Sequence, residues 1–135
     1  MSLTPGPPPD PEVAELLKYL DEVLADYARL VGGIGRLAFA APQLLYYRDE
    51  VQDLLEALAA EKSLDLQSRW QKIRDLDNQV RARATDLVRE VGHPNFKQYQ
   101  VVNDPPPTRW WWYLNRTVSN PEPPPPPAWQ WWRRG

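Results

Sequence analysis

The sequence predicts an all-α protein: an antiparallel three-helix bundle with proline-rich, extended N- and C-terminal arms. The 16 prolines of the 135-residue chain gather at its two ends, and only Pro42 and Pro94 lie between them. In the middle, apolar residues recur three and four positions apart in three segments, as they do along one face of a helix. Three such helices joined by short turns bury their apolar faces best against one another. We therefore expect a leader (residues 1–9), a helical bundle (10–92) and an extended arm (93–135).

The first helix is expected to begin at Asp10, whose side chain can cap it while Pro11 occupies the first turn. Its apolar residues follow the alternating spacing of a heptad seam: Val13, Leu17, Leu20, Leu24, Tyr27 and Val31. The pair Gly32-Gly33 ends the helix, because glycine is poor inside a helix and common just after one.

Two further helices are expected before residue 93. The second begins or bends at Pro42 and continues to about Lys62. Its apolar face consists of Leu44, Tyr47, Val51, Leu54 and Leu58. The third, capped by Ser63 or Asp65, is expected to run without interruption to Gly92. Its apolar face consists of Leu66, Trp70, Ile73, Leu76, Val80, Ala84, Leu87 and Val91.

The arm that follows Gly92 is expected to be extended. Residues 93–95, the sequence His-Pro-Asn, are typical of a turn. Residues 96–102 alternate enough in polarity to favour a short strand or an irregular extended segment.

Composition excludes several classes of function. The net charge of −2 gives no overall attraction for nucleic acid, which we disfavour as a partner. The absence of cysteine excludes disulfides and thiolate chemistry. The first ten residues do not resemble a secretory signal, and Arg29 and Arg36 interrupt the longest apolar-leaning stretch, so we expect no membrane-spanning helix. The expected location is the cytoplasm, with a position peripheral to a membrane as the alternative.

Catalytic residues are not evident. An enzyme needs side chains whose protonation or nucleophilicity can be tuned, and His93 is the only histidine. No glycine-rich phosphate loop and no metal-type histidine spacing accompany it. We therefore expect no catalytic residue, no cofactor and no enzymatic activity.

Carboxylates on the first two expected helices give a minor alternative, an all-α hydrolase of nucleotides that depends on Mg²⁺. These carboxylates are Asp21, Glu22, Asp26, Asp49, Glu50, Asp53 and Glu56. A solvated acidic face is the favoured interpretation, because Leu54, Leu55 and Leu58 occupy the buried face of the second helix and unpaired buried carboxylates are costly. We expect no metal site.

The C-terminal arm is the candidate binding site. Six of the seven tryptophans lie in the last 26 residues, and such large apolar rings are rarely left in water. Tryptophan and arginine are enriched at binding hot spots, and five consecutive prolines favour a rigid polyproline II helix. The predicted partner-binding residues are Trp110, Trp111, Trp112, Tyr113, Pro123, Pro124, Pro125, Pro126, Pro127, Trp129, Trp131, Trp132, Arg133 and Arg134.

Several surfaces could receive this arm. The leading hypothesis is a non-enzymatic protein-interaction or accessory subunit that docks on a protein partner through the arm. The arm could equally fold back onto its own bundle, with Trp70 and the pair Tyr46-Tyr47 as receivers. The charge distribution favours such an attraction, because six acids face two bases between Asp10 and Val31, whereas four arginines face two acids in the last 32 residues. A membrane surface, a proline-reading domain and self-association through the helices remain alternatives.

Overall fold

The computed structural model describes residues 11–61 and 65–118, and the regular secondary structure in these ranges is all helical, with no strand. The elements are α1 (Pro11–Gly32), η1 (Ala38–Ala40), α2 (Ala41–Leu58), α3 (Gln67–Ala82), α4 (Ala84–Val91), α5 (His93–Asn103) and η2 (Trp110–Arg116), where η denotes a 3-10 helix. The all-α prediction is confirmed. The proline-rich leader and the arm beyond residue 118 lie outside the described residues.

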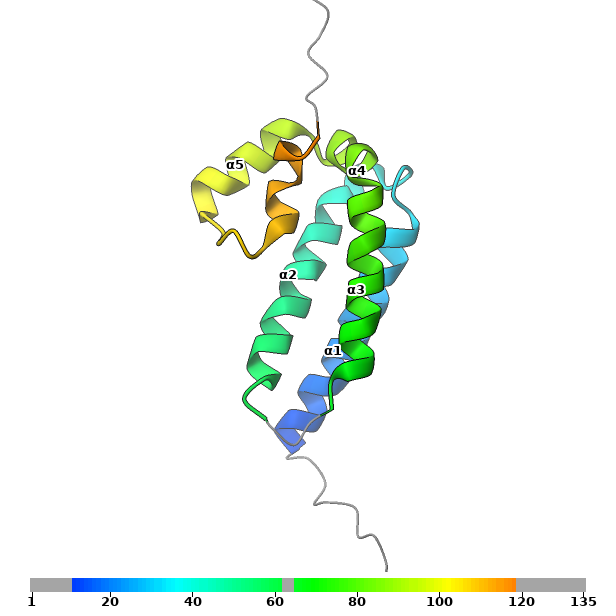
Figure 1. The fold of residues 1–135 in the computed structure, drawn as a ribbon, viewed down its shortest axis with the longest axis vertical. Coiled ribbons are helices and arrows are strands. Elements are labelled where there is room, and N and C mark those ends of the chain that lie inside the picture. Colours follow the sequence, from blue (N-terminus) through cyan, green and yellow to red (C-terminus); the bar gives the residue numbers. More distant parts are fainter. Residues whose placement is uncertain (1–10, 62–64, 119–135) are drawn as a thin grey trace, which may run out of the picture.

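Three long helices run side by side along the longest axis of the molecule (Figure 1). Helix α1 contacts both α2 and α3, and α2 runs in the opposite direction to the other two. Helices α4, α5 and η2 gather around the end of the molecule at which α2 begins. This second group of helices adds a layer that periodicity did not predict.

The core consists of two apolar clusters. The cluster near the start of α1 joins α1, α2 and α3 through residues such as Leu20, Leu55 and Ile73. The cluster at the opposite end joins residues of α1, α2, α3, α4 and α5 to Trp111 and Trp112 of η2. Residues from the expected arm are therefore part of the core.

The boundaries of the first two helices follow the sequence signals closely. Helix α1 ends at Gly32, and Pro42 lies in the first turn of α2, where its missing N–H is not needed. Helix α2 ends at Leu58, before the expected Lys62. At the start of α3 the capping residue is Leu66, not the expected Ser63 or Asp65, although Asp65 Oδ1 accepts a hydrogen bond from the Gln67 amide (2.9 Å) just before the helix.

The expectation of one uninterrupted third helix is wrong. The chain leaves the helical conformation at Arg83 (φ −112°, ψ 24°), which separates α3 from α4. The break redirects the apolar face of α4, so that Leu87 and Val88 pack into the second cluster and α4 contacts both α2 and η1. The break is stabilised by the Arg83 guanidinium, which donates a hydrogen bond to the Ile34 carbonyl oxygen.

The expectation of a turn and a strand over residues 93–102 is also wrong, because this segment is helix α5. Gly92 adopts a positive φ (93°) that reverses the chain after α4, a conformation that other residues rarely adopt. Pro94 then occupies the first turn of α5, so the proline that suggested a turn begins a helix instead. Phe96 is buried and fixes α5 to the second cluster.

Candidate functional site

The candidate site begins where α5 ends and the chain folds back. Asp104 adopts a left-handed conformation (φ 43°, ψ 58°), which terminates α5 and turns the backbone. The following residues return along α5 as η2, whose packing partners include α5, α2 and α4. We call residues 109–116 the aromatic segment. Trp111 and Trp112 in it are only 1% and 3% exposed.

Asp49 of α2 is the central acceptor for the aromatic segment. Its Oδ1 accepts hydrogen bonds from the indole Nε1 of Trp111 and of Trp112, both at 2.8 Å. The same oxygen lies 3.0 Å from Nη1 of Arg109. Its Oδ2 accepts the Tyr99 hydroxyl at 3.2 Å. One carboxylate thus satisfies two buried indole N–H groups, which would otherwise be costly to bury.

Arg109 joins the aromatic segment to a second acid. Its Nη2 donates to Asp53 Oδ1 at 2.5 Å, one helical turn beyond Asp49 on α2. Desolvation opposes the charged guanidinium, but the hydrogen bonds to Asp53 and Asp49 outweigh it and raise the pKa of Arg109. One of the four arginines counted in the arm therefore pairs with acids of the helical body, but these acids lie on α2 and not in the acidic stretch from Asp10 to Val31.

Aromatic rings surround Trp112 on two sides. The ring of Tyr99 stacks on it, with centroids 3.4 Å apart and planes within 6°. The ring of Tyr46 meets it edge-on at 5.4 Å and 65°. Burial, followed by the charge of Asp49, raises the pKa of Tyr99 to about 12, so its hydroxyl remains a donor at neutral pH.

Trp111 and Trp110 are held by cations of the helices. The guanidinium of Arg48 lies over the Trp111 ring at 4.1 Å from the centroid, and that of Arg81 lies over Trp110 at 4.0 Å. Arg48 is itself buried in an ion pair with Asp77, at 3.0 Å between Nε and Oδ1.

The buried ion pair between Arg48 and Asp77 is completed by Tyr27. The Tyr27 hydroxyl donates to Asp77 Oδ1 at 2.7 Å, and burial raises the pKa of this phenol. These contacts link α1, α2 and α3 directly beneath the aromatic segment. Side chains from three helices therefore hold in place the surface on which the aromatic segment lies.

A groove opens between the first turns of α2 and helix α5, beside the aromatic stack. Its volume is about 370 Å³. Trp112 and Phe96 line it and are buried, whereas Tyr46 and Val102, at 52% and 72% exposure, reach solvent. The groove is therefore apolar at its buried surface and aromatic at its edge.

The structure places only part of the predicted partner-binding set. Trp110, Trp111, Trp112 and Tyr113 pack against the protein's own helices, the arrangement that the fold-back alternative described. Of the expected receivers, Tyr46 contacts Trp112, whereas Trp70 is exposed on α3. The remaining predicted residues lie outside the described residues: Pro123, Pro124, Pro125, Pro126, Pro127, Trp129, Trp131, Trp132, Arg133 and Arg134.

Several acidic residues of α1 and α2 have partners within the protein. Asp49 and Asp53 pair with Arg109, Asp21 pairs with Arg69, and Glu50 accepts the Tyr19 hydroxyl. Within residues 11–61 and 65–118, no group of three or more acidic or histidine side chains is placed to hold a metal ion. Asp21, Asp49 and Asp53 thus receive arginine side chains, Asp49 also receives the two indoles and the Tyr99 hydroxyl, and Glu50 receives a tyrosine hydroxyl.

Sequence reasoning missed Asp49 and Tyr99 as contact residues. Asp49 lies off the apolar face of α2, so its position indicated solvent. The excess of arginines in the arm pointed to an acidic receiver, but the acid excess counted from the sequence lay between Asp10 and Val31 and not on α2.

Comparison of the chain with protein-family models, curated protein sequences and solved structures finds no match. Among the described helices, none combines the length and apolar content that crossing a membrane requires.

Proposed function

We propose that the protein is a non-enzymatic accessory subunit, in which α1, α2 and α3 form a helical bundle that anchors a C-terminal arm for binding a protein partner. One observation supports this proposal above all. The start of the arm is fixed in the core by two buried tryptophans and an arginine, all bound to Asp49. An arm that leaves a rigid body from a fixed point loses less entropy on binding than a free tail does.

The proposal divides the predicted site into two parts. Trp110, Trp111, Trp112 and Tyr113 anchor the arm, and their contact surface is the protein's own body. The partner then meets the second half of the arm, through Trp129, Trp131, Trp132, Arg133 and Arg134. These residues have the composition of a binding hot spot, and the prolines before them limit the conformations they must lose.

Copurification tests this function in two steps. The full chain and a chain ending at Val118 are immobilised, and a protein retained by the full chain alone is identified and purified. Its affinity is then measured for a variant in which Trp129, Trp131 and Trp132 are changed to Ala. We expect binding to weaken at least 30-fold, roughly the effect of losing one hot-spot tryptophan.

The matched control is Trp70→Ala, which removes an exposed tryptophan from α3 and should leave the affinity unchanged. A partner that binds the triple variant as tightly as the full chain contradicts the proposal.

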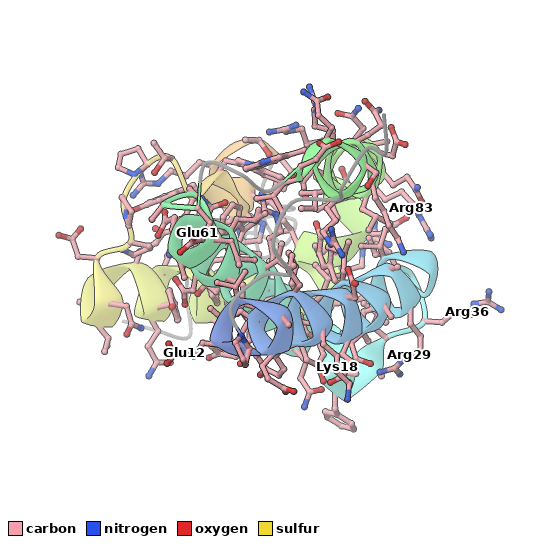
Figure 2. The ribbon with its side chains drawn as sticks, turned by 90° about the horizontal axis from the view of Figure 1, so that it is seen from below. Glu12, Lys18, Arg29, Arg36, Glu61 and Arg83 are labelled. Carbon is pink, nitrogen blue, oxygen red and sulfur yellow. The ribbon has the colours of Figure 1, made fainter. Side chains whose placement is uncertain are left out.

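A peripheral membrane-surface function is the second candidate, favoured by the loop between α1 and α2. Phe39 on η1 is 102% exposed. The Glu90 carboxylate fixes this loop by accepting the backbone N–H groups of Gly35, Leu37 and Ala38 at 2.5, 2.5 and 3.1 Å. Arg29, in the last turn of α1, and Arg36, in this loop, point outward from the protein (Figure 2). A fixed apolar ring near cations suits the headgroup layer of an anionic membrane.

Sedimentation with anionic vesicles at low salt distinguishes the two functions. If the membrane function holds, the full chain pellets with the vesicles and Phe39→Ala reduces the bound fraction. If the chain stays in the supernatant, the membrane function is excluded and the accessory-subunit function is unaffected.

A further inference from the structure

We propose that the groove between α2 and α5 binds a polyproline II helix, and that its occupant is the proline run of the same chain, residues 123–127. This inference rests on the proposed function, since it concerns the path that the arm takes from its anchor to its tryptophans. It adds an intramolecular binding site that would fix the direction in which the end of the arm leaves the protein.

The lining of the groove suits a run of prolines. Polyproline helices dock on apolar grooves with aromatic walls, because the pyrrolidine rings pack against the flat faces of tyrosine and tryptophan. Here Tyr46 and Tyr99 contact each other edge to face, with ring centroids 6.1 Å apart, and together with the buried Trp112 they form one aromatic wall of the groove. No charged side chain lines the groove. An uncharged proline run matches this surface better than a motif with basic residues.

Polar groups of the groove also match the backbone of the proposed occupant. A polyproline II helix has no internal hydrogen bonds, so its carbonyl oxygens need external donors. Gln98 lies in the groove on α5 and is exposed, and its side chain makes no hydrogen bond within the described part of the chain. Its side-chain amide can therefore donate to a docked carbonyl. Asn103, at the C-terminal end of α5, adds a second amide to the lining.

The length of the chain after Val118 fits the position of the groove. Val118 lines the same pocket as Ala84 and Thr85 at the start of α4, whereas Val91, the last residue of α4, and Asn95 in the first turn of α5 belong to the groove. The eight residues of α4 rise about 12 Å. Residues 119–122 can span about 13 Å when extended. They therefore suffice to bring the proline run to the near end of the groove.

The proline run also matches the length of α5. Five residues of a polyproline II helix extend about 15 Å. The 11 residues of α5 rise about 16 Å along the groove. A linker of four residues gives the run a high effective concentration at the groove, in the millimolar range typical of short linkers. Even a weak site would then be filled by its own chain before a free peptide could enter it.

Paramagnetic relaxation in the full chain tests the inference. The protein has no cysteine, so Ala128→Cys provides a unique attachment point for a nitroxide directly after the prolines. We expect the label to reduce the amide signals of the groove, in the first turns of α2 and along α5. Replacing all five prolines with alternating Gly and Ser, which leaves the body unchanged, should restore these signals.

Two single substitutions test whether the signal loss depends on the groove or on any exposed aromatic side chain. Tyr46→Ala removes a half-exposed wall of the groove and should also restore the signals. Phe39→Ala removes an exposed aromatic ring that does not line the groove and should leave the signal loss intact. Signal loss that is equal in the proline-replaced chain and the unmodified chain overturns the inference.

A mixed sample identifies the occupant. Nitroxide-labelled chains without ¹⁵N are added to ¹⁵N-labelled chains without nitroxide. We expect no loss of groove signals in this mixture. If the groove signals are lost there, the occupant comes from a second copy, and the assignment to the same chain is wrong.

The outcome is independent of the partner experiment. If the label does not reach the groove, the inference fails, while loss of partner binding in the tryptophan variant still supports the proposed function. If the label reaches the groove and no partner is retained by the arm, the groove site stands and the proposed function fails.

Discussion

At the scale of a residue, the single carboxylate of Asp49 holds most of the polar contacts between the aromatic segment and α2. On α2 it accepts both indole N–H groups of the aromatic segment, the Tyr99 hydroxyl and one side of Arg109. An acid with four donors is fully satisfied, so its partial burial is not costly. Removing it would leave two buried indole donors without an acceptor.

We expect Asp49→Ala to lower the free energy of unfolding by about 2 to 4 kcal/mol, because each unsatisfied buried donor costs about 1 to 3 kcal/mol. Urea denaturation followed by circular dichroism measures this change. Asp53→Ala is the matched control. Asp53 is exposed, and Arg109 is the one residue of the aromatic segment that it contacts. Asp53→Ala should therefore lower the free energy of unfolding by less than about 1 kcal/mol. Equal losses in the two variants would show that Asp49 does not have the central role assigned to it.

At the scale of an element, the sequence predicted helices more reliably than their ends and directions. Helix α1 agreed with its expectation, because its heptad spacing, Pro11 and the glycine pair all indicate the same element. The break at Arg83 was not visible, since the apolar spacing continues through it and the bend depends on a contact with Ile34 far away in the sequence. Helix α5 was missed because Pro94 is compatible with both a turn and the first turn of a helix.

The segment after Asp104 acts as a structural element of the body even though it was expected to belong to the arm. It buries Trp111, Trp112 and Leu114 in the second core cluster. A chain ending at Asn103 loses these three side chains, each of which contributes about 1.5 to 3 kcal/mol. We expect it to be destabilised by at least about 4 kcal/mol relative to the full chain, or not to fold.

A chain ending at Val118 is the control for this deletion, because it retains the whole aromatic segment. We expect its thermal unfolding midpoint to stay close to that of the full chain. If the chain ending at Asn103 unfolds at the same temperature as the chain ending at Val118, residues 104–118 are not part of the cooperative body.

At the scale of the whole molecule, the sequence indicated that the acidic helices and the basic aromatic arm attract each other, but it could not say which residues meet. Periodicity assigns Asp49 to solvent because the apolar face of α2 runs through Val51 and Leu55. The aromatic segment covers the other side of that helix, and only the fold brings the two together. The four tryptophans of the described residues therefore fall into different environments, with Trp111 and Trp112 buried and Trp70 exposed.

Tryptophan emission should resolve these environments. In a chain ending at Val118, we expect blue-shifted emission that resists iodide, because Trp111 and Trp112 are buried and Trp110 is covered by Arg81. Trp70 is exposed and should supply the fraction that iodide quenches. The control is Trp70→Phe, which should remove this quenchable fraction.

The full chain adds Trp129, Trp131 and Trp132. If these await a partner, as proposed, the difference between the two chains is red-shifted and freely quenched until the partner is added. A blue-shifted difference that iodide cannot reach would mean that the end of the arm is already buried within the protein or its oligomer, and the arm would then stabilise the protein itself.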